Sequence, residues 1–135
     1  MTRTEAKNVL IKEFQSSFTY PYQVAYENNP DFTKPTDEPW VRLTVRNNQS
    51  IQRAFGEEGQ RKFERMGIVS YQVFIPTGVG TYDGEEVCDH INSIFEGKSF
   101  GVIYCETGYW TETGRDGTDW FQFNGRIFFN FDEIK

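Results

Sequence analysis

Apolar side chains recur every three or four residues near the start of the chain, which predicts an amphipathic helix over residues 4–18. Thr2 is followed three residues later by Glu5, so the two form a capping box at the first turn. Pro21 ends the helical pattern, because proline disfavours helical backbone in the residue before it. The buried stripe consists of Ala6, Leu10, Ile11, Phe14 and Phe18.

A second helical pattern follows the glycine-containing turn of residues 76–80. Asp83 and Glu86 have the spacing of a capping box, and Gly97 has the position of a left-handed C-terminal stop. We expect this helix to pack on a sheet through Val87, Ile91, Ile94 and Phe95.

Other stretches alternate between apolar and polar residues, as half-buried strands do. The apolar face carries Val41, Leu43, Val45, Val69, Tyr71, Val73, Ile75, Phe121, Phe123, Ile127, Phe129 and Phe131. Gly125 interrupts the last run, and we interpret it as a bulge or a bend. Shorter strands are predicted at residues 23–26 and 100–105, with a loop at 27–39 between the first two strands.

Residues 50–55 and 62–66 are predicted to form the arms of a long hairpin that is too polar to belong wholly to the core of one subunit. Residues 106–119 are rich in glycine and threonine and are interpreted as a loop that carries Tyr109 and Trp110. The order of elements predicts an α+β domain over residues 1–135, with a mostly antiparallel sheet, two helices on one face and a protruding hairpin.

Composition narrows the functional classes. The chain has 135 residues, 17% of them aromatic, and a formal net charge of -6, which repels a phosphate backbone and argues against a dedicated DNA-binding domain. Cys88 and Cys105 are too few and too far apart for a zinc or redox motif, so both are expected as free, buried thiols in a reducing cytoplasm. No signal sequence or membrane-spanning stretch is recognisable, and we expect a soluble protein.

Three candidate chemical motifs are weak. The glycine loop of residues 78–84 departs from the dinucleotide-binding spacing and leads into acidic residues that would repel a pyrophosphate. Ser93 and Cys88 lie near His90 in sequence but lack the setting of an activated nucleophile. The third motif is a group of acidic residues that could in principle hold calcium, namely Glu106, Glu112, Asp116 and Asp119. Their spacing matches no EF-hand loop. We therefore expect no enzyme, no metal and no cofactor.

The candidate interface residues are basic and aromatic. We predict that copies of the chain meet one another or partner proteins through Arg53, Phe55, Arg61, Lys62, Phe63, Arg65, Tyr109 and Trp110. The basic hairpin could be an interaction arm or simply the solvated side of a strand pair, and the sequence leaves both interpretations open. Charge reversal at Arg61 and Arg65 is expected to weaken assembly without unfolding the chain.

Several short motifs, taken in order, resemble the tail terminator-like family of long-tailed bacteriophages. The resemblance rests on residues 39–43 at the start of a strand, on 67–69 leading into 72–76 with Gly78 and Gly80 after it, and on a helix ending at residues 94–95. It implies a structural virion protein, assembled in the host cytoplasm, that forms a homohexameric ring, caps the tail tube and presents a surface to head–tail connector proteins. DNA would pass through such a ring without specific binding, and no membrane is involved.

Two alternatives stay open at this stage. One is another neck or tail adaptor with a similar fold, and the other is a small α+β ligand-binding or enzyme domain with a pocket between sheet and helices. A ring requires two unlike, complementary patches on each subunit, whereas a pocket enzyme is usually a monomer or dimer. A mass measurement would separate these classes.

Overall fold

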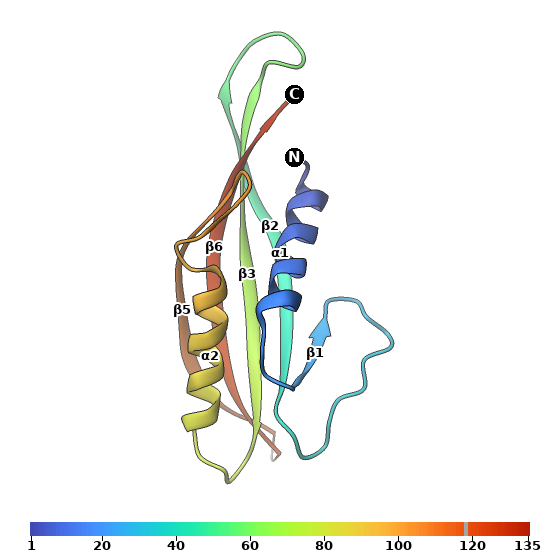
Figure 1. Ribbon diagram of the computed structural model, residues 1–135, viewed down its shortest axis with the longest axis vertical. Coiled ribbons are helices and arrows are strands. Elements are labelled where there is room, and N and C mark those ends of the chain that lie inside the picture. The colour runs from blue at the N-terminus through green and yellow to red at the C-terminus, as the bar shows by residue number, and fades with distance from the viewer. Residues whose placement is uncertain (118) are drawn as a thin grey trace.

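The computed structural model describes residues 1–117 and 119–135, with the backbone alone for Asp116. Six strands form one sheet and two helices pack against it (Figure 1). The elements are α1 (Arg3–Ser17), β1 (Gln23–Tyr26), β2 (Trp40–Ala54), β3 (Lys62–Pro76), α2 (Tyr82–Phe95), β4 (Ser99–Phe100), β5 (Ile103–Asp116) and β6 (Trp120–Ile134).

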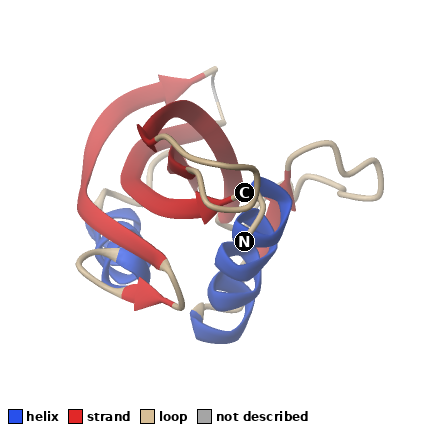
Figure 2. Cartoon of the chain, turned by 90° about the horizontal axis from the view of Figure 1, so that it is seen from above, coloured by secondary structure: helices blue, strands red, loops and turns tan. Residues whose placement is uncertain are grey.

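The sheet has the strand order β1-β2-β3-β6-β5-β4. The β1–β2 pair is parallel and every other pair is antiparallel. Figure 2 shows that the sheet is curled and that both helices lie on the same side of it. We call the side that faces the helices the inner face and the opposite side the outer face. The α+β class predicted from the sequence is confirmed.

The two helices begin differently. In α1 the predicted capping box is present: the Glu5 backbone N–H donates to Thr2 Oγ1 at 3.2 Å, and the Glu5 carboxylate accepts from the Thr2 backbone. The predicted capping box of α2 is wrong, because that helix begins at Tyr82 with Thr81 as its N-cap and no side-chain cap bond. Gly97 ends α2 in a left-handed conformation, as predicted, with φ of 72°.

The long strands bury every second residue against the helices, as the alternation predicts. Their register explains Gly125, which is neither a bulge nor a bend: β3 pairs with β6 without interruption from Lys62 to Pro76. Tyr71 lies directly opposite Gly125, and a Cβ atom at residue 125 would overlap the Tyr71 aromatic ring. The glycine therefore leaves room for a side chain that crosses the neighbouring strand.

Residues 106–119, expected to be a loop, mostly form strand, which corrects the prediction. β5 continues to Asp116 along the free edge of β6. The register shifts between Cys105 and Gly108 and again between Glu112 and Gly114. These irregularities absorb extra residues and break the simple alternation, so the sequence lacks the usual signature of a strand.

The predicted hairpin is the end of a longer extension that we call the arm, residues 47–66 together with residues 130–134. It projects beyond both helices (Figure 1). The N-terminus lies at the end of α1, and the C-terminus lies along the arm, where the Lys135 backbone N–H donates to the Arg61 carbonyl at 2.9 Å. It differs from the prediction in having three strands, because β6 pairs with β3 as far as Lys62 and Ile134. Three paired strands make the arm a stiffer element than an isolated hairpin.

Candidate assembly surfaces

The basic residues of the arm are mostly neutralised within it. Arg53 Nε lies 2.7 Å from Glu64 Oε2, and Lys62 Nζ lies 3.3 Å from Asp132 Oδ2. Arg61 donates from Nε to the backbone carbonyl of Lys135 at 3.1 Å. The arm therefore carries ion pairs rather than the uncompensated basic patch that its sequence suggests.

Arg65 occupies a different environment from the other predicted interface residues. It is only 6% exposed, and its guanidinium lies 5.0 Å from the centre of the Phe63 aromatic ring. Its Nε donates to Glu133 Oε1 at 2.9 Å, in a pair whose side chains are 7% and 14% exposed. Charge reversal at Arg65 would leave Glu133 facing a second buried carboxylate, so the burial of this pair argues that the change would also disturb the fold, unlike the expectation from the sequence.

The tip of the arm, residues 55–60, is acidic and apolar. Phe55 is 87% exposed, and Glu57 and Glu58 follow it on the exposed turn. Phe63, the other aromatic residue proposed for the interface, is half-buried beneath Arg65 and Lys135. Phe55 is thus the exposed aromatic side chain of the arm.

Tyr109 and Trp110 lie in β5 and point to opposite faces, because consecutive strand residues alternate. Tyr109 is 46% exposed on the outer face, near Phe128. Trp110 faces α2: its Nε1 donates to Asp89 Oδ1 at 2.8 Å, and its indole meets Phe123 edge to face. Of the two, only Tyr109 is left in water as predicted, and Trp110 links β5 to the helix.

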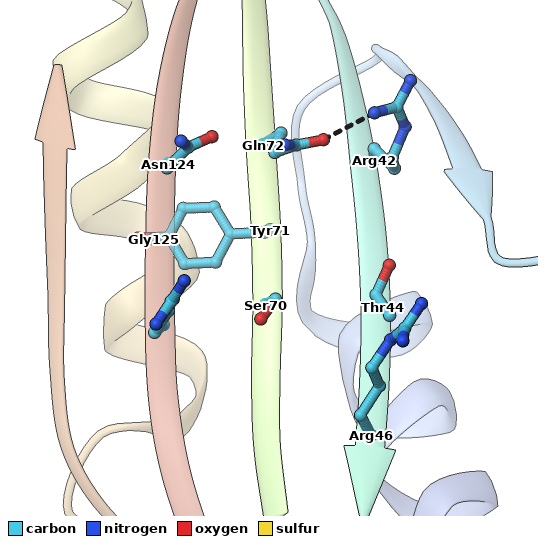
Figure 3. Close-up of a pocket in the computed structure, with 9 residues that line it drawn as sticks. Arg42, Thr44, Arg46, Ser70, Tyr71, Gln72, Asn124 and Gly125 are labelled. Atoms are coloured by element: carbon cyan, nitrogen blue, oxygen red, sulfur yellow. Dashed lines mark hydrogen bonds between the residues drawn. The ribbon is translucent and has the colours of Figure 1, made fainter. Parts of the chain in front are cut away.

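The outer face contains a hollow of about 220 Å³ that sequence reasoning missed. Its floor is a lattice of polar residues from three adjacent strands, with Arg42, Gln72 and Asn124 in one row (Figure 3). Thr44, Ser70 and Arg126 form the next row, and Arg46 stands at the edge. Arg42 and Arg126 are far apart in sequence, so only strand pairing brings them together.

The hollow is positively charged, and none of its lining residues is acidic. Arg46 pairs with Glu27 at 2.7 Å on the exposed border. Arg42 donates to Gln72 Oε1 at 2.7 Å, a neutral partner, and lies over the aromatic rings of Trp40 and Phe74. Neither Arg42 nor Arg126 forms an ion pair with any residue that the structure describes. The hollow therefore offers guanidinium groups to an anionic partner.

Within the part of the chain that the structure describes, the histidine and the two cysteines have structural surroundings. His90 lies against the aromatic rings of Phe18 and Tyr20, and its Nε2 accepts from the Thr19 backbone at 3.3 Å. Cys88 and Cys105 are free and buried, as predicted, and burial raises the pKa of each thiol to about 12. Such thiols are almost wholly protonated at neutral pH and are poor nucleophiles.

The acidic residues considered for calcium are dispersed as far as they are described. Glu112 approaches Glu85 of α2, and a hydrogen bond between these two side chains raises the pKa of Glu85. The side chain of Asp116 lies outside the described part of the chain. Over the described residues, no group of three or more His, Cys, Asp or Glu side chains has the arrangement of a metal site. In the same residues, no helix has both the length and the hydropathy needed to cross a membrane.

Comparison with known proteins agrees with an assembly role. Among the curated proteins, none matches this chain. Sixteen chains of solved structures are similar to it; one of them, named only by a sequence code, is 18% identical with a TM-score of 0.65. That match covers 93% of this chain and 94% of the other and supports the fold alone. The family model described as "Phage tail terminator protein" matches residues 7–122. This protein therefore belongs to the phage tail terminator family, a family of structural proteins that complete the bacteriophage tail.

Proposed function

We propose that the protein forms a homohexameric ring on the end of the tail tube, ends tube growth there and presents its other face to head–tail connector proteins. A tube of identical rings grows as long as its end accepts another ring. Stopping it requires a protein that fits the tube end on one side and offers no tube-accepting surface on the other. Shape and binding are sufficient for this task, and no reaction is needed.

The arm is the observation that carries this proposal. A three-stranded extension projects beyond the domain, and its tip, which begins with an 87% exposed phenylalanine, adds nothing to the buried core of its own subunit. An aromatic side chain at the end of a projecting arm can serve as an anchor in a partner, and an arm can reach a neighbouring subunit in a ring. Arg53, Phe55, Arg61, Lys62 and Tyr109 stay candidates for contact with neighbours or with tube and connector.

Deletion of the gene from the phage tests the function directly. We expect tails of uncontrolled length that fail to join filled heads in electron micrographs, with rescue by a plasmid-borne copy. Joined virions with normal tails would contradict the proposal. Normal-length but unattached tails would instead favour the adaptor alternative.

Native mass spectrometry of the purified protein, alone and with tube protein, tests the ring. The expected species contains six copies of the 15.8 kDa chain. A monomer or dimer under both conditions would favour the ligand-binding or enzyme alternative.

A further inference from the structure

Two features of opposite charge lie apart on the same subunit: the acidic tip of the arm, and the arginine-lined hollow on the outer face over the centre of the sheet. We propose that the tip of one copy docks in the hollow of the next copy, with Glu57 and Glu58 facing Arg42 and Arg126. This inference rests on the proposed ring function. It names the contact that joins consecutive subunits.

The tip has the chemistry that the hollow accepts. Glutamate carboxylates and arginine guanidiniums form short, charge-assisted hydrogen bonds, and the planar guanidinium can bind both carboxylate oxygens. Neither Glu57 nor Glu58 forms an ion pair with a described residue, so both carboxylates are available to a partner. Arg42 and Arg126 are available in the same way.

The same subunit cannot satisfy its own hollow. Continuous strand pairing carries the tip away from the two helices, whereas the hollow lies on the part of the sheet that backs them (Figures 1 and 3). The arm would have to break its pairing with β6 to fold back. The tip must therefore meet the hollow of a second copy, which is a head-to-tail contact of the kind that generates rings.

The dimensions and the total charge favour this occupant over DNA. A hollow of about 220 Å³ has room for a few side chains of a turn, whereas a duplex needs an extended basic track because its charges continue along both strands. The net charge of -6 also opposes the approach of DNA. A turn of the same protein that carries carboxylates is small enough for the hollow, and it does not have the extended phosphate charge that the protein would repel.

Two complementary charge reversals test the contact. The tip variant is Glu57→Arg with Glu58→Arg, and the hollow variant is Arg42→Glu with Arg126→Glu. Each alone should weaken ring assembly, measured by analytical ultracentrifugation, by about tenfold or more, because like charges then face each other. An equimolar mixture of the two should recover assembly, since every tip then finds an oppositely charged hollow on the other variant.

The matched control reverses two adjacent exposed acids outside both surfaces, Asp37→Arg with Glu38→Arg, and should assemble as the wild type does. Circular dichroism should show wild-type melting for the tip variant, whose altered side chains are exposed. Wild-type assembly of the tip variant, or no recovery in the mixture, would overturn the docking contact and leave the ring proposal intact. A wild-type protein that forms no ring even with tube protein would instead overturn the ring itself.

A short DNA duplex serves as the competing ligand in the same series. If the wild type binds it at physiological salt and the hollow variant alone does not, the hollow is a phosphate site and the proposed contact is wrong. We expect no measurable binding of the duplex to any of these proteins.

Discussion

The two faces of the sheet are made from alternate residues of the same strands, yet they have different chemistry. The inner face is apolar and aromatic and is covered by α1 and α2. The outer face is polar over the centre of the sheet, where arginines from β2 and β6 line a hollow. Side chains of one face hold the fold while those of the other stay available for recognition, so neighbouring residues can be expected to differ in what their substitution disturbs.

Two ion pairs in the arm also differ according to whether they are buried or exposed to solvent. Arg65 and Glu133 lie on the inner face, where their side chains are 7% and 14% exposed, whereas Arg53 and Glu64 form a pair whose side chains are 51% and 25% exposed. A charge that is buried without its partner retains its desolvation cost, while an exposed one is hydrated. We therefore expect the contribution of each ion pair to stability to depend on how exposed its side chains are, rather than on the distance between its nitrogen and oxygen atoms.

The largest expected effect therefore comes from Arg65→Ala, which should lower the free energy of unfolding by about 3 kcal/mol because Glu133 loses its partner. Urea denaturation measures this change. Arg53→Ala is the matched control and should cost less than about 1 kcal/mol. If both variants lost the same free energy of unfolding, burial would not explain the difference expected between the two ion pairs.

A smaller loss is expected from Gly125→Ala on the inner face, about 2 kcal/mol, because the new methyl group would overlap the Tyr71 aromatic ring. Tyr71 is anchored in place, since its hydroxyl donates to Asn92 Oδ1 at 2.6 Å or to the Cys88 carbonyl at 3.1 Å. Asn124→Ala, one residue away on the outer face, should change thermal stability little. Wild-type melting of the Gly125 variant would contradict the assigned packing.

The smallest effect concerns β5. Trp110→Phe keeps an aromatic ring against Phe123 but removes the hydrogen bond to Asp89, which should cost about 1 kcal/mol of stability. Tyr109→Phe on the outer face should leave the melting temperature nearly unchanged. A larger loss for Tyr109 than for Trp110, measured by calorimetry, would reverse the assignment of faces.

Local patterns in the sequence were sufficient for much of the fold. Strict alternation in β3 and β6 identifies the buried face, because a strand turns successive side chains to opposite sides. The first helix, its cap at Thr2 and its buried stripe follow from spacing and from the hydrogen-bonding capacity of a threonine side chain. These features depend on residues that are close together in the chain.

Tertiary structure decided the features that join distant segments. Arg65 meets Glu133 across 68 positions, and the hollow combines Arg42 with Arg126 through the β2–β3–β6 order. The part of β5 beyond residue 105 escaped prediction because its irregular register hides the alternation, and it forms a strand by pairing with an available edge of β6. The sequence alone determined which residues could be buried or charged. Strand order and register determined which of them meet, because those contacts arise only when segments far apart in the chain are brought side by side.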